Sequence, residues 1–592
     1  MSRRNFLKTA GLSAVALTLP KTTGAADPSS ARRPNVILVM TDDQGYGDLA
    51  CHGNPVIQTP NLDRLHSESV RLTDFHVCPV CTPTRASLMT GRDTVRTGAW
   101  GTTWGRSLLR KDEVTVADVF AAGGYRTGMF GKWHLGDNYP FRPEDRGFHE
   151  VLRHGGGGVG QTTDYWGNDY FDDTYFHNGS PTKYTGYCTD VWFDGAMAFI
   201  EDSVKNGRPF FCYIPTNAPH GPLNVDEKYS KPYLEKGVPD NRARFYGMIT
   251  NFDENMARLE KKLDALGIRD NTILIFLTDN GTAGGYDRDR RTKKITGFNA
   301  GMRGTKGSYY DGGHRVPCFI RWPARGLHGG RDISEMTAHV DLTPTLIELC
   351  GIKQPDGVKF DGMSIAPLLL GKVAELPARS LFIQFRQSHE PPEKWNGAVM
   401  NRKWRLVNGT ELYNIETDSG QEKDVAAEHP DVVKKLRDDY EAWWAEVSKR
   451  FHEGCPIILG SDKENPTCLS GFDWHTQTPW NQRHILNGME ANSYWAVEIE
   501  RDGSYEFTLR RWPVEVDQPI IAAVPDGKAI AATTARLQIG DIEKEQPIPA
   551  DAKAVTFTLP MKAGKTRLQT WLIDEKTGES RGAYYVYVKR LG

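Results

Sequence analysis

The chain has 592 residues, which is longer than one ordinary domain and predicts two or three compact units. Its 73 lysine and arginine residues nearly balance 75 aspartate and glutamate residues, leaving a net charge of −2. This balance excludes an overall basic field of the kind that binds nucleic acid.

The first residues have the pattern of an export signal. Arg3 and Arg4 form a twin-arginine pair, an apolar run follows at 10–19, and small residues at 24–26 offer a cleavage site. The apolar run is too short to span a bilayer. We therefore expect residues 1–26 to be a twin-arginine-type signal peptide and the protein to be periplasmic or secreted. The alternative is a cytosolic chain that begins with basic residues by chance.

Short apolar runs that end in polar turns come next along the chain. Three of them cover residues 35–40, 209–214 and 272–277. Continuous apolar runs of this length are typical of strands that are buried on both faces of a parallel sheet. Helical patterns at 191–204 and 241–266 lie between them, and this alternation predicts an α/β fold with a large, mostly parallel, doubly wound sheet. Ligands of such sheets bind beyond the carboxyl ends of the strands, where polar clusters follow these runs.

The pattern changes near residue 377. Short strand-like runs precede a helical pattern at 431–449, so we interpret residues 377–452 as a smaller α+β subdomain. Residues 455–478 have the composition of a loop. Later runs such as 494–500 and 583–588 alternate with period two, which is typical of a β-sandwich. The expected organisation is an α/β domain at 33–376, the subdomain at 377–452 and an accessory β-sandwich at 466–592.

Nine cysteines are sparse for this length and do not indicate a disulfide scaffold. Cys455 and Cys468 are close in sequence and could pair in an oxidising compartment. Most of the others lie in apolar runs, as inert core cysteines do.

The segment from Cys81 to Arg92 combines a cysteine with a predicted helix start. Pro83 suits the first turn of a helix that stops at Gly91. Cys81 would then stand at the helix N-terminus, where the helix dipole favours an anionic ligand and activates a nucleophile. Arg85, one turn later, can lie on the same face.

The pair Cys78-x-x-Cys81 also has other interpretations. A zinc knuckle would need a second ligand pair at suitable spacing, and none is evident. A redox pair would need a small thioredoxin-like βαβ setting, which this sequence does not offer. A buried structural cysteine is the commonest role for any single cysteine.

Cys81-Thr-Pro-Thr-Arg85, followed by Ala-Ser-Leu-Met-Thr-Gly-Arg92, resembles the signature of the formylglycine-dependent sulfatases. These are arylsulfatase-like members of the alkaline-phosphatase superfamily. Further motifs extend the resemblance over most of residues 33–430. They are Thr41-Asp-Asp-Gln-Gly-Tyr-Gly-Asp48, Thr59-Pro-Asn-Leu-Asp-Arg-Leu65, Gly131-Lys-Trp-His-Leu-Gly136, Pro219-His220, Thr278-Asp-Asn-Gly281, Gly304-Thr-Lys-Gly307 and Glu411-Leu-Tyr-Asn414. Each motif alone is weak, but their shared order is specific to the family. Taken with the expected signal peptide and the loop residues described below, the resemblance suggests a bacterial exported carbohydrate sulfatase.

The candidate metal ligands are Asp42, Asp43, Asp279 and Asn280. Three carboxylates and an amide oxygen make a hard oxygen set that suits Ca²⁺ or Mg²⁺. Without a partner cluster, an aspartate pair at a strand end would simply be a solvated turn or a helix cap. The resemblance implies that the modified Cys81 is a further ligand.

The resemblance also implies the nucleophile. A formylglycine-generating enzyme would convert Cys81 to formylglycine, whose hydrate presents two hydroxyl groups. One hydroxyl attacks the sulfate sulfur and displaces the alcohol by S–O cleavage. The second loses its proton, expels inorganic sulfate and regenerates the aldehyde.

Five further side chains gain catalytic roles by the same resemblance. Arg85, Lys132 and Lys306 would neutralise charge on the nucleophile and on the sulfate oxygens. His134 would orient the hydrate and help to remove its proton. His220 would be the general acid that protonates the leaving alcohol.

The glycine run 155–158 leads into a segment where polar and aromatic residues alternate. Its candidate substrate-binding residues are His154, Asp164, Tyr165 and Trp166, which could stack a sugar ring and bind its hydroxyls. The alternative is an ordinary aromatic-packed loop. Residues 385–389 could also border the pocket. We expect a sulfated small molecule or glycan as substrate, with no membrane span.

Two other functions stay open at this point. The first is a phosphonate or phosphate ester hydrolase of the same superfamily, because some of these share the Cys-x-Pro-x-Arg motif. The second is a catalytically silent glycan-binding protein built on the same scaffold.

Overall fold

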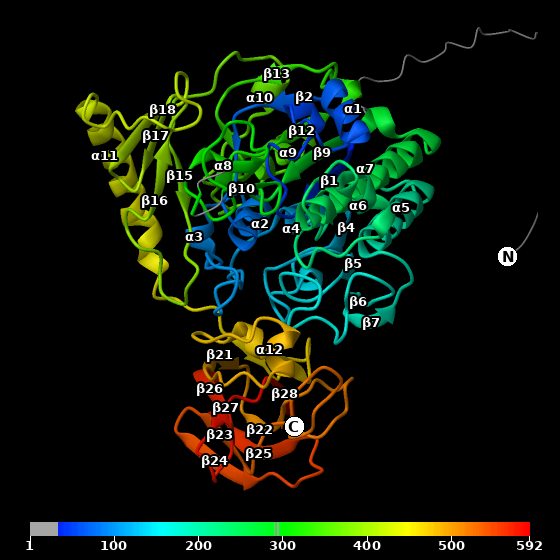
Figure 1. Ribbon diagram of the computed structural model, residues 1–592, viewed down its shortest axis with the longest axis vertical. Helices are drawn as coiled ribbons and strands as arrows, with labels where there is room; N and C mark the ends of the chain where they lie inside the picture. The colour runs from blue at the N-terminus through cyan, green and yellow to red at the C-terminus, as the bar shows by residue number, and fades with distance from the viewer. Residues whose placement is uncertain (1–32, 289–290, 293–294) are drawn as a thin grey trace, which may run out of the picture. The chain divides into compact units, whose positions relative to one another are not determined.

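The computed structural model describes residues 33–288, 291–292 and 295–592 (Figure 1). The expected signal peptide, residues 1–26, lies outside the described residues. Among the described helices, none combines the length and the apolar character needed to cross a membrane.

A ten-stranded sheet carries the first part of the fold. Its strand order is β13-β2-β12-β9-β1-β8-β4-β5-β6-β7. The bounds are β13 (Asp332–Ile333), β2 (Val70–Leu72), β12 (Cys318–Arg321), β9 (Thr272–Thr278), β1 (Asn35–Thr41), β8 (Phe210–Pro215), β4 (Arg126–Gly131), β5 (Glu150–Arg153), β6 (Thr174–His177) and β7 (Ser180–Lys183). The central strands β9, β1, β8, β4 and β5 are parallel, whereas β12, β6 and β7 pair antiparallel with their neighbours. The sheet is therefore mixed, with a parallel centre.

Helices cover both faces of this sheet, as the side chains of β1 show. Val36, Leu38 and Met40 pack in one core with α2 (Cys81–Thr90), α4 (Val116–Ala122) and α9 (Leu342–Leu349). Ile37 and Val39 point the other way, into a core with α1 (Pro60–Glu68), α5 (Cys188–Lys205) and α7 (Asp240–Ala265). Alternate residues of a strand face opposite sides, so a strand buried twice must be apolar throughout. The expected doubly wound α/β fold is confirmed.

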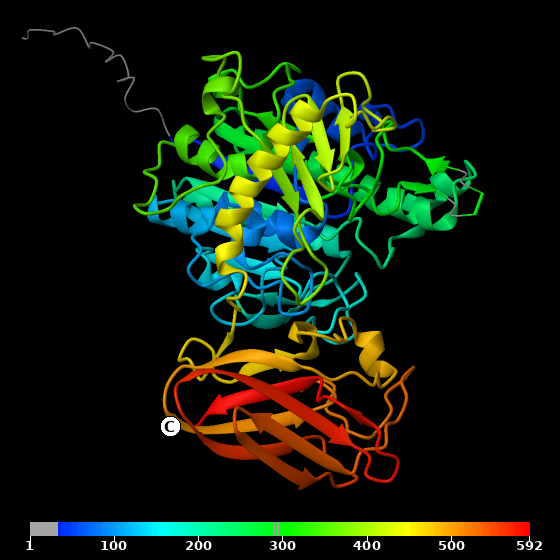
Figure 2. The ribbon, with the colours of Figure 1, turned by 90° about the vertical axis from the view of Figure 1, so that its left-hand side faces the viewer.

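A four-stranded antiparallel sheet follows. It consists of β15 (Leu381–Gln384), β16 (Gly397–Met400), β17 (Trp404–Val407) and β18 (Glu411–Asn414). Helix α11 (Pro430–Val447) lies across it and buries Leu436, Tyr440 and Trp443 against Val399 and Leu406 (Figure 2).

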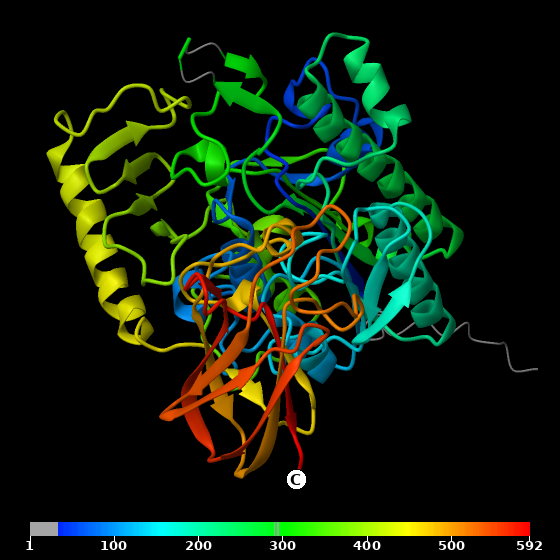
Figure 3. The same ribbon diagram turned by 60° about the horizontal axis from the view of Figure 1, so that its bottom comes forward.

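Two β-sheets form the C-terminal part (Figure 3). The first has the order β19-β21-β26-β23-β24 with β27 paired to β26, and the second the order β20-β28-β22-β25. Their bounds are β19 (Ile457–Leu459), β20 (Thr467–Ser470), β21 (Tyr494–Ile499), β22 (Gly503–Arg510), β23 (Thr534–Ile539), β24 (Ile542–Pro547), β25 (Val555–Met561), β26 (Gly564–Ile573), β27 (Ser580–Arg581) and β28 (Tyr585–Arg590). One apolar core lies between the two sheets, as in a sandwich.

The expectation of a loop at 455–478 was wrong in part. This stretch contains β19 and β20, which pair with β21 and β28. Strands of three or four residues are too short to show the alternation on which sequence reasoning depends. Cys455 and Cys468 are both free thiols, so they do not form the disulfide that their spacing allowed.

Candidate active site

Three carboxylates gather at the carboxyl ends of the adjacent strands β1 and β9. Asp42 and Asp43 follow β1, Asp279 follows β9, and the strand ends Thr41 and Thr278 are paired in register. Each carboxylate offers an oxygen within 4.8 Å of the others. The backbone N–H of Asp43 donates to Asp279 Oδ1 over 2.9 Å, which ties the two strand ends together.

The residues around this cluster fit a hard cation. The amide nitrogen of Asn280 donates to Asp43 Oδ1 over 3.0 Å. Within the described part of the chain, Asn280 Oδ1 and Asp42 Oδ1 are buried and have no hydrogen-bond partner. Buried acceptors without partners are costly, so these two oxygens require a ligand. Asp42, Asp43, Asp279 and Asn280 therefore supply a donor set suited to Ca²⁺ or Mg²⁺.

Cys81 is the first residue of α2, which ends at Gly91 in the left-handed conformation (φ 66°). The expected helix is confirmed. The Cys81 side chain is buried, and its Sγ lies 3.3 Å from His134 Nδ1. One turn later, Arg85 Nη2 donates to Asp279 Oδ2 over 2.8 Å and Nη1 donates to the carbonyl oxygen of Lys132 over 3.0 Å. Helix α2 thus directs the cysteine and the guanidinium toward the carboxylate cluster.

Burial governs the protonation of the Cys81 thiol. It raises the pKa of Cys81, against the lowering effects of Lys132 and Lys306. A thiol reacts as a nucleophile only when it is ionised. The encoded side chain is therefore not prepared to act as a thiolate at neutral pH.

Two lysines add positive charge around the carboxylate cluster. Lys132 follows β4 and its Nζ lies 2.5 Å from Asp42 Oδ2, with both side chains fully buried. Lys306 Nζ donates to Asp43 Oδ2 over 2.7 Å, and its side chain remains 26% exposed. Burial opposes ionisation of Asp43, but Lys306 and His220 hold the pKa of this carboxyl well below its usual value. The site opens to solvent on the side of Lys306.

A hydrogen bond to the backbone orients the imidazole ring of His134. Its Nε2 lies 2.9 Å from the carbonyl oxygen of Thr102, which accepts a hydrogen bond only if Nε2 carries the proton. Nδ1 then presents its lone pair to Cys81. Burial, reinforced by Lys132, lowers the pKa of His134 well below its usual value, so the ring is neutral and can accept a proton.

His220, beyond the end of β8, stands at the more exposed edge. Its Nδ1 lies 2.6 Å from the Gly221 carbonyl oxygen, and its Nε2 lies 3.7 Å from Asp43 Oδ2. The Tyr170 hydroxyl donates to the His220 carbonyl oxygen over 2.8 Å and fixes the backbone there. Burial lowers the pKa of His220 to about 4; Asp43 opposes this shift and the two lysines add to it.

A family model described as Sulfatase matches residues 34–352, more than half of the chain. The chain belongs to the sulfatase family. A second model, described as N-sulphoglucosamine sulphohydrolase, C-terminal, matches residues 305–444 of this sulfatase.

Relatives with established names agree with this assignment. Human arylsulfatase A is 34% identical over 391 residues, which cover 60% of this chain and 72% of that protein. The ulvan-active sulfatase of Formosa agariphila is 30% identical over 357 residues, which cover 56% of this chain and 64% of that protein. The solved structure of Ps i-CgsB in complex with k-i-k-neocarrahexaose has a TM-score of 0.63 at 27% identity and covers 72% of this chain and 95% of that chain. The sulfatase is therefore a sulfuric ester hydrolase, as the sequence motifs implied.

The four residues predicted to contact a sugar have varied surroundings in this sulfatase. His154 is buried, and its Nε2 has no hydrogen-bond partner among the residues that the structure describes. The carboxylate of Asp164 accepts hydrogen bonds from backbone N–H groups of its own loop. Trp166 packs edge-to-face on Trp512, with ring centroids 5.3 Å apart. Tyr165 borders a cavity of about 470 Å³ together with Asp164. Contacts within the protein thus account for the burial of Asp164 and the placement of Trp166.

Sequence reasoning missed residues that position His134 in the sulfatase. Thr102 positions His134 through its carbonyl oxygen and receives support from Gln387, whose Oε1 accepts from the Thr102 N–H over 3.0 Å. Phe472, from the C-terminal part, places its ring 6.1 Å from that of His134. No motif marks Thr102 or Phe472, which are far from His134 in sequence, whereas Gln387 lies in the segment 385–389 that was expected to border the pocket. In the glycine run 155–158, Gly157 packs directly on the His134 ring.

Proposed function

We propose that this sulfatase releases inorganic sulfate from sulfated carbohydrates through a formylglycine made from Cys81. The observation that carries the proposal is the convergence on Cys81 of a hard-cation ligand set, two lysines, an arginine and two histidines. A sulfate ester carries negative charge that increases on the oxygens as sulfur transfers. Preorganised cations around the nucleophile stabilise that charge.

Each side chain then has a definite task. The hydrate of the modified residue 81 supplies one hydroxyl, whose oxygen attacks sulfur as its proton passes to the neighbouring Asp279 carboxylate, while Arg85 and Lys306 hold the sulfate oxygens. His220 Nε2 gives a proton to the departing alcohol oxygen, and the charge of a bound sulfate ester beside it favours the protonated ring. His134 Nδ1 then takes the proton of the second hydroxyl, the C–O bond to sulfate breaks and the aldehyde forms again. A Ca²⁺ or Mg²⁺ ion held by Asp42, Asp43, Asp279 and Asn280 would supply positive charge beside the nucleophile.

Three observations support a carbohydrate as the alcohol. The ulvan-active sulfatase is a relative, and Ps i-CgsB was solved with a neocarrahexaose. Trp480 leaves 46% of its surface exposed, as a sugar-stacking side chain would. The carbonyl oxygen of Trp480 accepts from the N–H of Thr162, and the adjacent Gln161 accepts from the N–H of Gly157, beside His134. Trp480 and the predicted Tyr165 are the aromatic residues that we propose for the rim of the site.

The proposal includes maturation and export. A formylglycine-generating enzyme would act on Cys81 as its partner. Residues 1–26 would direct the product to the periplasm or the medium as a twin-arginine-type signal.

The experiment measures modification and turnover together. Protein produced with a formylglycine-generating enzyme should carry an aldehyde at residue 81 by peptide mass spectrometry and should release sulfate from sulfated oligosaccharides. Cys81→Ala should melt at the same temperature and release none, and removal of divalent metal should abolish release by the wild type. Faster hydrolysis of matched phosphate or phosphonate esters would favour the alternative hydrolase. Saccharide binding without any turnover by aldehyde-containing protein would favour a silent binding protein.

A further inference from the structure

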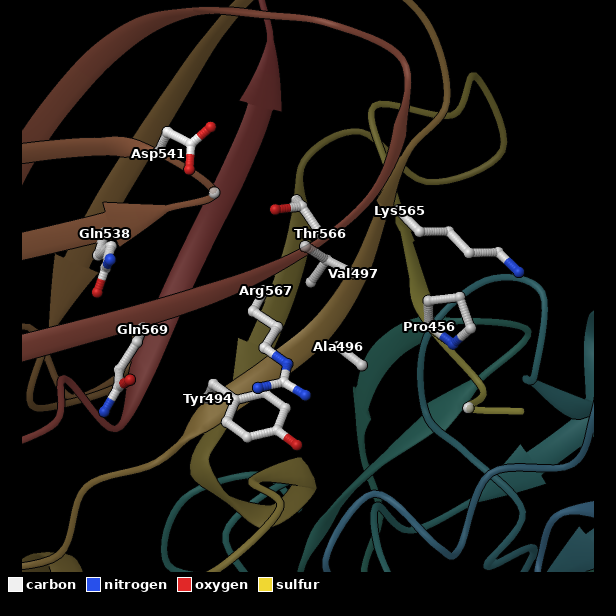
Figure 4. Close-up of a pocket in the computed structure, with 12 residues that line it drawn as sticks. Pro456, Tyr494, Ala496, Val497, Gln538, Asp541, Lys565, Thr566, Arg567 and Gln569 are labelled. Atoms are coloured by element: carbon white, nitrogen blue, oxygen red, sulfur yellow. The ribbon is translucent and has the colours of Figure 1, made fainter. Parts of the chain in front are cut away.

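A hollow of about 660 Å³ lies on the outer face of the C-terminal sheet that contains β21, β26 and β23 (Figure 4). Its wall includes Tyr494 and Ala496 from β21, Arg567 and Gln569 from β26, and Gln538 from β23. None of these residues belongs to the catalytic or metal-binding set. We call this feature the β-sheet hollow.

The strand register explains its shape. Gln569 is paired with Tyr494 on one side and with Gln538 on the other, so the three side chains form one row across the sheet. In the next row, Ala496 is paired with Arg567. The side chain of alanine ends at Cβ, which leaves the surface lower at Ala496 than at Tyr494. A large residue in place of Ala496 would therefore fill the floor of the hollow.

The hollow also holds positive charge that carboxylates do not neutralise. The Arg567 guanidinium lies next to the Tyr494 ring (Figure 4), and its central carbon is 4.3 Å from the ring centroid. Lys565 also lines the hollow; Glu498, its cross-strand neighbour, forms its ion pair with Lys111. On the same strand as Gln538, Arg536 is instead neutralised by Glu545 at 2.5 Å. Asp541, on the far side of Gln538, is the acidic member of the lining.

We propose that the β-sheet hollow binds a sulfated saccharide at a site separate from the nucleophile. This inference rests on the proposed function, because the ligand belongs to the class of the proposed substrate. Arginine and lysine are suited to sulfate oxygens, and the amides of Gln538 and Gln569 offer both donors and acceptors to sugar hydroxyls. Asp541, at the opposite end of the row from Tyr494, can accept a hydrogen bond from a sugar hydroxyl.

The hollow adjoins the segment that positions His134. The His475 ring stacks on Tyr494 with centroids 4.8 Å apart, and a side chain at Gly105 would meet the His475 ring at 2.5 Å. Gly105 lies three residues after Thr102, whose carbonyl oxygen contacts His134. A polymer held in the hollow would stay close to the catalytic site and raise the local concentration of its sulfate groups.

The test measures retention of the full-length protein in native gels that contain dextran sulfate. Arg567→Ala should weaken binding about tenfold, which corresponds to the loss of one or two charge-assisted contacts. Ala496→Trp, which fills the floor, should weaken it similarly. Arg536→Ala is the matched control, because it removes a paired arginine from the same sheet face, and it should bind like the wild type. All three should hydrolyse 4-nitrophenyl sulfate at the wild-type rate.

Two control polymers complete the experiment: unsulfated dextran, a saccharide without charge, and polyglutamate, an anion without sugar. Equal retention of all variants by dextran sulfate would overturn the proposal. So would an equal loss of polyglutamate binding in Arg567→Ala and Ala496→Trp, since that would show a general anion surface. Failure of the wild type to release sulfate from any ester would refute the proposed function instead, and the binding measurement does not depend on that result.

Discussion

At the scale of single residues, charge and proton position organise the site. His134 is buried, and its Nδ1 faces Cys81 because Nε2 is held by the Thr102 carbonyl oxygen. His220 is more exposed and stands beside Asp43 and the solvent-facing Lys306. A buried neutral imidazole suits a base, and one at the edge, close to an incoming alcohol, suits an acid. The two histidines differ in surroundings as their proposed tasks differ.

His220→Ala should therefore slow substrates with poor leaving groups most. We expect kcat/KM to fall about 10²–10⁴-fold for sugar sulfates, the range for loss of a general acid, and clearly less for 4-nitrophenyl sulfate. The measurement is kcat/KM over a series of esters with different leaving-group pKa values. His177→Ala, a change of a partly exposed histidine on β6, is the control and should have no effect. An equal loss across the series would contradict the acid role.

At the scale of elements, the glycine run between β5 and β6 lets a loop approach both histidines. A Cβ on Gly157 would lie 2.2 Å from His134 Cε1, and one on Gly158 would lie 3.4 Å from His220 Nδ1. Glycine is the residue that permits such close backbone contact. The same loop is tied internally by the Asp164 carboxylate. A segment chosen as a sugar-binding candidate is thus also the support of the catalytic rings.

Gly157→Ala should displace the His134 ring without unfolding the protein. A shift of about 1 Å at a catalytic group can cost about 10²-fold, so we expect kcat/KM to fall by about that factor. Thermal melting should change little. Gly420→Ala, where the nearest atoms would lie at 3.4 Å, is the matched control and should keep full activity. Unchanged kcat/KM in the Gly157 variant would show that the loop can move away at no cost.

At the scale of the whole molecule, the C-terminal sheets are joined to the α/β part through specific polar contacts. Glu464, just before β20, accepts hydrogen bonds from the Tyr139 N–H at 3.0 Å and the Asn138 side chain at 3.5 Å. The Tyr585 hydroxyl donates to the Thr162 carbonyl oxygen over 2.9 Å. Phe472 reaches the neighbourhood of His134 from the same part. The C-terminal part therefore contributes residues to the surroundings of the active site.

The contact at Glu464 predicts a pH dependence of stability. Burial raises the pKa of Glu464 from 4.5 to about 7, and Arg142 opposes this shift. The folded state then binds a proton that the unfolded state has lost, so the stabilisation is full below pH 4.5 and is lost as the pH rises through about 7. Glu464→Gln cannot ionise and should gain thermal stability relative to the wild type over this range. Melting temperatures at matched pH values measure the difference, and parallel curves for the two proteins would contradict the prediction.

The sequence by itself determined the α/β fold and the strand ends that carry Asp42, Asp43 and Asp279. It did so because buried parallel strands must be apolar throughout and because their polar neighbours follow at once in the chain. The helix that begins at Cys81 was predictable for the same reason: Pro83 and Gly91 act locally. The order of the motifs then implied the family.

Only the tertiary structure decided how distant segments meet. It gave Asp164 and Trp166 partners within the protein and brought Thr102 and Phe472 to His134. It also paired the short strand β19 with β21 and the short strand β20 with β28. It also placed Arg567 opposite Ala496 on a sheet face. Such contacts depend on strand register and side-chain packing between residues tens to hundreds of positions apart, and local sequence patterns carry no record of them.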